Sequence, residues 1–211
     1  MTKIGIKRTF NLHKYSTQLR EIISEWKTII TLSVAILGLI CGTLSGKGEG
    51  ELYKTISETL FLKIFNSESA ESYISLITNL LYPTIFFIIS FFCGLSAYGV
   101  FISNFIPFSY SMLIGMVTYF LYSEYKLKGL AFFVINILPF SALSLLGILL
   151  VTAESINMSQ TVLSVLSNKN KRSAYNFTFY YKNSIKCYAF VVLSAMVKTV
   201  LDRLFIGLIS F

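Results

Sequence analysis

The residues best suited to do chemistry in this chain are charged side chains inside an apolar segment near the C-terminus. Lys198 and Asp202 are four residues apart, so a helix would present both on one face, and Arg203 follows directly. Charges inside such a segment mark a site for ion pairing, proton transfer or partner binding. Because Lys198 can neutralise Asp202, we predict a structural ion pair, with a proton or partner-binding site as the alternative.

Other catalytic and metal-binding patterns are missing from the sequence. The one histidine, His13, lies outside the apolar segments, which excludes histidine-rich metal sites. The three cysteines lie in apolar runs without paired spacing and are interpreted as small buried side chains. Paired membrane acids, a phosphate-binding loop and a Gly-rich dinucleotide motif are also absent. We therefore predict that the protein is not an enzyme and uses neither a metal nor a cofactor.

Composition assigns these residues to a membrane protein. The 211 residues are 55% hydrophobic and 13% charged, whereas about a quarter of the residues of an average soluble domain are charged. Phe occurs 19 times and Tyr 13 times, which is more apolar bulk than a soluble core of this size can bury. A soluble domain, a disordered chain and a disulfide scaffold are excluded, and the lipid bilayer is the predicted surrounding.

Gaps between the charges locate the helices that must position the candidate residues. A bilayer core needs about 20 apolar residues of helix. The longest charge-free run, 72–123, has 52 residues, which is enough for two spans and a tight connection. We predict an all-α, polytopic membrane bundle of about five transmembrane helices, with six as the upper count. The predicted spans are residues 28–46, 76–100, 105–122, 129–152 and 186–208.

Lys and Arg in the connecting segments predict the orientation of the bundle, because cytoplasmic loops carry an excess of positive charge. An N-terminus on the inside places eleven basic residues inside and five outside. We therefore predict a multi-pass protein of the cell membrane, with a cytoplasmic N-terminus and an extracytoplasmic C-terminus. The formal charge of +8 is then mainly a topology signal and not a sign of nucleic-acid binding.

Residues 1–27 are predicted to form a cytoplasmic segment ahead of a single transmembrane domain, 28–211. Apolar residues recur at helical spacing from Leu12 to Trp26, which predicts an amphipathic helix on the inner membrane surface. A partner-docking helix is the alternative. The basic turn 168–172 and the aromatic cluster 175–181 are typical of a positive-inside signal and an interfacial belt.

Small residues and one proline interrupt the predicted spans. Gly38 and Gly42 form a GxxxG pair, and Gly94 and Gly99 lie near the end of the second span. Such residues predict close helix packing, either within the chain or at a contact with a partner or a second copy. Pro139 lies in the middle of the fourth predicted span, where it is expected to kink the helix. A broken helix at a transport site is the alternative.

Two stretches carry a resemblance to a known family. Residues 92–100, FCGLSAYGV, followed by Pro107, resemble the glycine-rich second helix of the stage II sporulation protein M family. Residues 128–133, KGLAFF, leading to Pro139, resemble the lysine-glycine, apolar-run, leucine-proline signature of that family. Residues 201–203 resemble its late helix, where the family often has a glutamate.

The resemblance implies an all-helical bacterial membrane protein without catalysis of its own. Such a scaffold would anchor cell-wall remodelling partners, the peptidoglycan hydrolases of sporulation, at the membrane. Lys128, Gly129 and the outer face would then lie near these partners.

Two other functions stay open from the sequence. One is the permease subunit of an ABC-type exporter that pairs with a separate ATPase, because an N-terminal amphipathic helix and a basic inner loop would suit it. The other is a small ion or solute carrier, which depends on Pro139 and Asp202 alone.

Overall fold

Every regular element in the described part of the chain is helical. The computed structural model describes residues 26–46, 55, 72–167 and 177–205. The predicted amphipathic segment before residue 26, the loop 47–71 apart from residue 55, the basic turn 168–172 and the end of the last predicted span lie outside the described residues. The elements are the helix Trp26–Ser45, α3 (Ser72–Gly94), α4 (Gly99–Ile102), α5 (Phe105–Phe132), the π-helical turn η2 (Phe133–Ile137), α6 (Leu138–Leu166) and α7 (Phe177–Phe205). The predicted all-α class is confirmed for these residues.

Four of the described helices are long and apolar enough to cross a bilayer, so the chain is a membrane-embedded protein. They are Trp26–Ser45, Leu76–Gly94, Gly99–Leu166 and Phe177–Leu204. The third is a helical run of 68 residues, more than three times the roughly 20 residues that a bilayer core needs. This run contains the predicted third and fourth spans.

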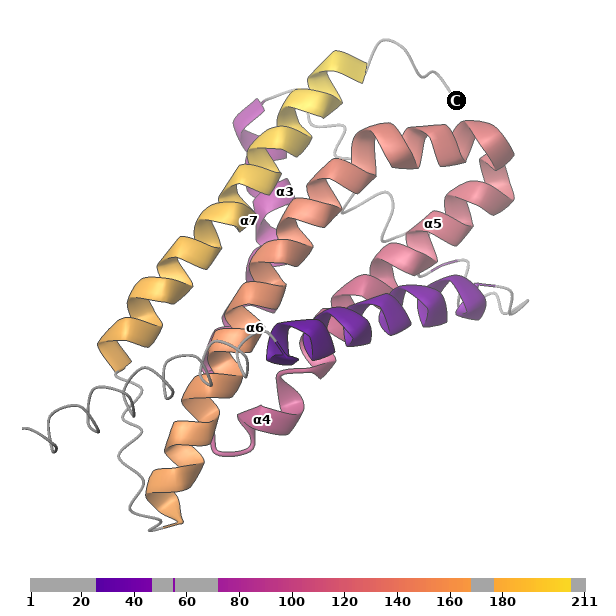
Figure 1. Ribbon diagram of the computed structural model, residues 1–211. Helices are drawn as coiled ribbons and strands as arrows, with labels where there is room; N and C mark the ends of the chain where they lie inside the picture. Colours follow the sequence, from indigo (N-terminus) through magenta and orange to yellow (C-terminus); the bar gives the residue numbers. More distant parts are fainter. Residues whose placement is uncertain (1–25, 47–54, 56–71, 168–176, 206–211) are drawn as a thin grey trace, which may run out of the picture.

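The long helical run reverses direction at Lys126. Lys126 has the non-helical dihedral angles φ 51° and ψ −127° inside α5, within the turn predicted between the third and fourth spans. The residues after it cross one end of the bundle, and α6 then runs back against the direction of α5 (Figure 1). Gly129 permits this reversal, because a Cβ atom there would overlap the backbone carbonyl of Leu121.

Pro139 lies inside the helical run Gly99–Leu166, in the first turn of α6 and directly after the π-helical turn. The helix departs from regular α geometry just before the proline: the N–H of Leu138 donates to the carbonyl of Phe133, five residues back. Such a distortion is the one expected of a proline inside a helix. The predicted fourth span, 129–152, therefore comprises the end of α5, η2 and the first part of α6.

The last helix also begins earlier than predicted, at Phe177 instead of residue 186. Lys182 and Lys186 lie on exposed positions of α7, where a charged side chain does not interrupt a helix. At 29 residues, α7 is about 43 Å long. The length of α7 exceeds the roughly 30 Å thickness of the hydrocarbon core. The run without charged residues therefore marks only the apolar middle of this helix.

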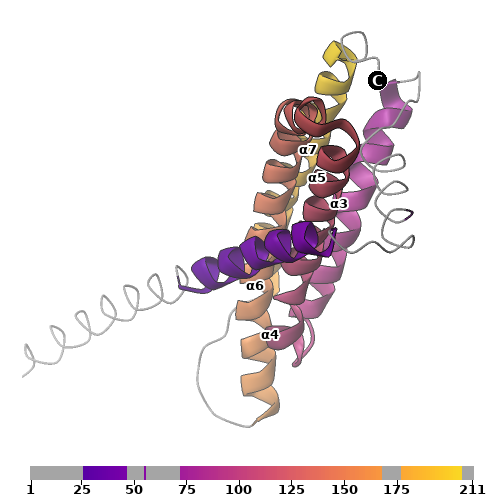
Figure 2. The same ribbon diagram turned by 90° about the vertical axis from the view of Figure 1, so that its right-hand side faces the viewer.

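Helices α3, α6 and α7 pack side by side along most of their length (Figures 1 and 2). The helix Trp26–Ser45 crosses the bundle obliquely (Figure 2). Its Gly38 and Gly42 lie against the backbone of Phe108 and Met112 in α5, where a Cβ atom would overlap each carbonyl. The GxxxG pair is thus used for close helix packing inside this chain.

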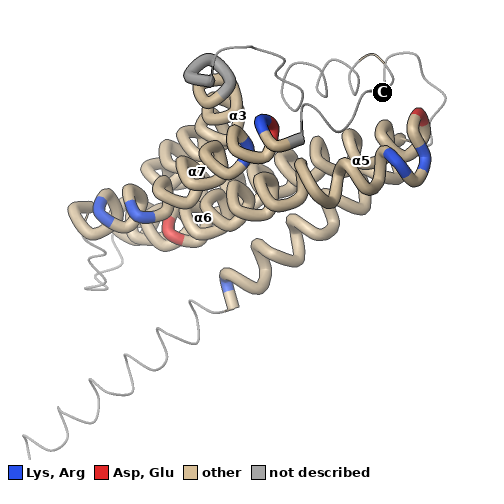
Figure 3. Tube along the Cα trace, turned by 90° about the horizontal axis from the view of Figure 1, so that it is seen from above, with Lys and Arg blue, Asp and Glu red and all other residues tan. Residues whose placement is uncertain are grey.

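Charged residues of the described chain lie mainly toward the ends of the helices (Figure 3). The outward faces between them carry large apolar side chains such as Ile36, Ile89 and Leu193, each between two-fifths and three-fifths exposed. Such a surface is stable only against lipid.

Candidate functional site: a buried ion pair held by two asparagines

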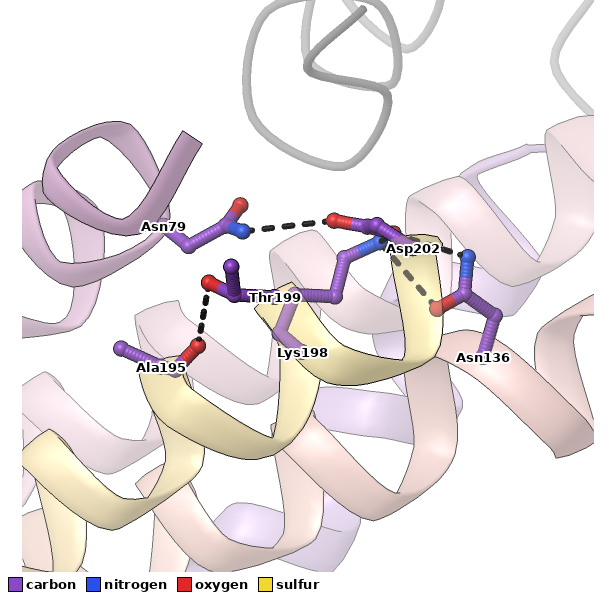
Figure 4. Close-up of polar contacts among 6 residues, drawn as sticks. All are labelled: Asn79, Asn136, Ala195, Lys198, Thr199 and Asp202. Carbon is purple, nitrogen blue, oxygen red and sulfur yellow. Dashed lines mark hydrogen bonds and ion pairs between the residues drawn. The ribbon is translucent and has the colours of Figure 1, made fainter. Parts of the chain in front are cut away.

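The ion pair predicted from the sequence spacing is present in α7. Lys198 and Asp202 form an i, i+4 ion pair, with the Lys198 side chain 0% and the Asp202 side chain 13% exposed. Lys198 lies about two turns before the described end of α7. The pair is therefore close to the end of the span and covered by protein instead of lipid (Figure 4).

Two asparagine side chains from other elements complete this cluster. Asn136 of η2 donates from Nδ2 to Asp202 Oδ1 at 3.2 Å and accepts from Lys198 Nζ at Oδ1, at 3.3 Å. Asn79 of α3 donates from Nδ2 to the second carboxylate oxygen, Asp202 Oδ2, at 3.3 Å. The cluster thus connects α3, η2 and α7 through charge-assisted hydrogen bonds (Figure 4).

Asn136 reaches the ion pair from the buried face of the helical run. It is 4% exposed, while Val134 and Ile135 are about half exposed. Phe133 and Phe140, three residues before and four residues after Asn136, are buried as well. Helical spacing therefore places this amide on the inner face, beside Lys198 and Asp202.

In chemical terms, both charged groups of this cluster have an ion-pair partner and hydrogen-bond partners. Removing two ions from water is costly, and the cost is recovered only when the geometry is good and further hydrogen bonds satisfy the remaining atoms. Lys198 has an anionic and an amide partner, and each oxygen of Asp202 accepts at least one hydrogen bond. The arrangement fits a contact that holds three elements together.

Sequence reasoning did not identify Asn79 and Asn136. Each is a polar side chain within an otherwise apolar, charge-free run, and that is the signal that could have identified it. Arg203, by contrast, is exposed on the last described turn of α7. Lys128 is exposed at the reversal, next to the buried Gly129.

A second polar network lies toward the opposite end of the same helices. The Tyr180 hydroxyl donates to the Phe91 carbonyl at 2.8 Å, and the Ser155 hydroxyl donates to the Ser90 carbonyl at 2.7 Å. The Ser155 and Tyr180 oxygens are themselves 3.0 Å apart. Gly94 is required here, because a Cβ atom would overlap the Tyr180 hydroxyl.

Tyr180 is the exception to the predicted interfacial belt among the described residues of the aromatic cluster. Its side chain is 0% exposed, whereas Phe177, Phe179 and Tyr181 are each about half exposed. Helical periodicity explains this difference in exposure, since about one position in four along the helix points into the bundle. The ring of Tyr180 stacks on Phe91 with centroids 5.1 Å apart.

The chain between α3 and α4 is fixed by Ser159 of α6. The Ser159 hydroxyl donates to the Ser96 carbonyl at 2.6 Å and accepts from the Val100 N–H at 2.9 Å. Gly99 is buried there, and a Cβ atom on it would overlap the Cys93 carbonyl. This short connection lies within the resemblance stretch 92–100, whose Gly94 and Gly99 have local packing roles in this structure.

Replacing Tyr180 with phenylalanine is expected to lower the free energy of unfolding by about 1 kcal/mol, because a buried hydroxyl loses its partners while the ring stacking persists. Thermal unfolding in detergent measures this change. Tyr181→Phe is the matched control, since Tyr181 is exposed, and should shift stability by less than about 0.5 kcal/mol. Equal shifts in both variants would contradict the network.

No metal site is formed by the side chains that the structure describes: within residues 26–46, 72–167 and 177–205, no three His, Cys, Asp or Glu side chains come together. The polar atoms of the two networks come from Asn, Ser, Thr, Tyr, Lys and Asp side chains. Within each network, these atoms contact other atoms of the same network.

The motifs that resemble the stage II sporulation protein M family occupy the α3–α4 connection, the reversal after Lys126 and the end of α7. Each of these places has a structural role in this chain, as described above. No protein-family model, curated protein or solved structure matches this chain.

Proposed function

We propose that this protein is a non-catalytic membrane scaffold that anchors cell-wall remodelling partners, such as peptidoglycan hydrolases, at the bilayer. The observation that supports this function most directly is the use of the buried polar groups. Lys198, Asp202, Asn79 and Asn136 form one cluster of ion-pair and hydrogen-bond contacts that joins three elements. A bundle held in this way is suited to present a fixed surface.

The proposal includes five spans, with the N-terminus inside and the C-terminus outside. The reversal at Lys126 would then lie on the outer face. Residues 122–128 are all exposed, and they carry Glu124, Lys126 and Lys128 next to the rings of Tyr122 and Tyr125. Aromatic and charged side chains together are typical of protein contacts. We propose that an envelope partner binds at this surface.

A second function, the permease subunit of an ABC-type exporter, is supported by one contact. Lys27 at the start of the first described helix donates to Asn157 Oδ1 at 2.5 Å and to Gln160 Oε1 at 2.7 Å, both in α6. The chain therefore enters its first described helix beside the last turns of α6. A separate ATPase would bind on this face.

Site-specific photo-crosslinking in cells distinguishes the two functions. A crosslinker at Tyr122 or Tyr125 should capture a peptidoglycan hydrolase if the scaffold proposal holds, whereas one at Gln160 should capture an ATPase if the exporter subunit is correct. The matched control is Ile89, which is exposed on the apolar face of α3. Capture of an ATPase from residue 160, with no envelope protein from residues 122 and 125, would overturn the scaffold proposal.

The proposed orientation predicts opposite labelling at the two ends of the bundle. In a cysteine-free background, Glu124→Cys should react with a membrane-impermeant maleimide in intact cells. Lys182→Cys should react only after the cells are opened, because α7 would begin on the inner side. The reverse pattern would place the N-terminus outside.

A further inference from the structure

Lys126 has a backbone conformation that a residue with a side chain rarely adopts. Among the residues that the structure describes, it is the one non-glycine residue with a positive φ, 51°, and its ψ is −127°. These angles are close to those of the first central residue of a type II′ turn, about 60° and −120°. That position is usually taken by glycine, because a Cβ atom is crowded there. Glycine is therefore the residue expected at this reversal.

The lysine gains no contact within the described chain that would offset this conformation. Residues 122–128 are all exposed, so folding buries little of the Lys126 side chain. Its ammonium group forms no hydrogen bond or ion pair with the residues that the structure describes. A side chain held in such a region lowers stability, and the cases that persist are concentrated at binding sites and ligand clamps. A contact outside the chain would account for a lysine at this position.

Exposed apolar side chains accompany Lys126. Leu127, the next residue, is 77% exposed, and the rings of Tyr122 and Tyr125 are exposed as well. Aromatic side chains are enriched in protein interfaces. Residues 122–128 also contain two lysines and one acid, and these charged residues lie together at the far end of α5 (Figure 3). The reversal thus presents apolar groups together with a positive net charge.

A folded protein surface explains the strained backbone better than lipid does. Headgroup phosphates move laterally in the bilayer, and a lysine reaches them along its flexible four-carbon stem from many backbone conformations. A folded partner offers its carboxylates at fixed positions, so the direction of the Cα–Cβ bond decides whether the ammonium group can reach them. The backbone at Lys126 fixes this direction at the cost of stability.

We propose that Lys126 is a specificity-determining contact of the reversal and pairs with carboxylates on a folded, acidic surface of the envelope partner. This role rests on the proposed function, which supplies that partner. Leu127 provides the apolar part of the same contact, and Lys128 adds a second positive charge. An exposed charge pair contributes little affinity, so the lysines act mainly by selecting an acidic partner.

Two measurements on the full chain test this role. A photo-crosslinker at Tyr122 measures capture of the hydrolase in cells, and thermal unfolding in detergent measures stability. Lys126→Gly should raise the unfolding temperature by about 2–4 °C, because the strain is relieved. The same variant should reduce hydrolase capture about threefold, because the charge is lost. A general folding defect would instead lower both stability and capture.

Two further variants separate the charge from the backbone conformation. Lys126→Gln keeps a side chain at positive φ, so the unfolding temperature should stay nearly unchanged while capture falls as in Lys126→Gly. Lys126→Arg keeps the charge and should retain capture. The matched control is Lys182→Gln, which removes an exposed lysine at the opposite end of the bundle and should change neither measurement.

Four results would overturn this role, and the first leaves the proposed function intact. It is undiminished capture of the hydrolase in both Lys126→Gly and Lys126→Gln. An unfolding temperature that does not rise in Lys126→Gly would show that the backbone is not strained. Loss of bound phosphatidylglycerol from Lys126→Gln in native mass spectrometry, with capture unchanged, would assign the lysine to lipid. No hydrolase captured from residue 122 of the otherwise unchanged protein would overturn the proposed function and this role together.

Discussion

Asp202→Ala is expected to lower the free energy of unfolding by about 3–5 kcal/mol, because it leaves the Lys198 ammonium buried without its anionic partner. Lys198 is fully buried, and the alanine would also remove the acceptor for Asn79 and Asn136. Unfolding of the purified protein in detergent, by heat or by denaturing detergent, measures the change. The variant should lose the contact of Asn79 in α3 with α7 and keep only the Lys198–Asn136 hydrogen bond between α7 and η2.

The neighbouring Arg203→Ala is the matched control and should change stability by less than about 0.5 kcal/mol, since Arg203 is exposed. The double variant Lys198→Met with Asp202→Leu should recover most of the loss, because apolar replacement of a buried ion pair is often neutral. An Asp202→Asn protein that assembles normally but loses transport of an ion or solute would instead favour the carrier hypothesis.

Gly42→Leu is expected to cost about 3 kcal/mol or more, because the new side chain would meet backbone and not a flexible side-chain end. A Cβ atom at residue 42 overlaps the Met112 carbonyl, and on the facing helix a Cβ atom at Gly115 overlaps the Leu39 carbonyl. The helix Trp26–Ser45 and α5 can approach so closely only with glycine on both sides. Unfolding in detergent again provides the measurement.

Cys41→Leu is the matched control, because Cys41 precedes Gly42 but is exposed. It adds a similar side chain toward lipid and should be nearly neutral. If Gly42→Leu and Cys41→Leu proved equally stable, the helix would pack elsewhere. If Gly42→Leu instead changed the oligomeric state without changing the stability of the monomer, the GxxxG pair would be a contact between copies.

Much of the candidate site could be predicted from spacing, but its surroundings could not. Lys198 and Asp202 are neighbours on any helix because four residues make about one turn. Asn79 and Asn136 lie 123 and 66 residues away from Asp202 in sequence, and only the packing of α3 and η2 brings them to Asp202. The sequence shows that these two amides are present, but it does not show how the helices cross and bring them to Asp202.

The positions of the helices, too, could be predicted only in part from the sequence. Charge-free runs located the apolar middle of the helices, because lipid tolerates few charges there. They did not locate the ends: α7 begins at Phe177 because Lys182 and Lys186 fit on its exposed face. Pro139 was expected to distort a span, and the helical run Gly99–Leu166 departs from regular α geometry in the π-helical turn directly before it.

The sequence by itself determined the class of this protein, its membrane setting and the pairing of its one intramembrane acid. Those properties follow from composition and from spacing along one helix, which are local. The tertiary structure alone decided that Asn79 and Asn136 join the ion pair, that Tyr180 is buried and that Gly38 and Gly42 pack against α5. These contacts join residues on different helices, and their geometry depends on how the helices cross.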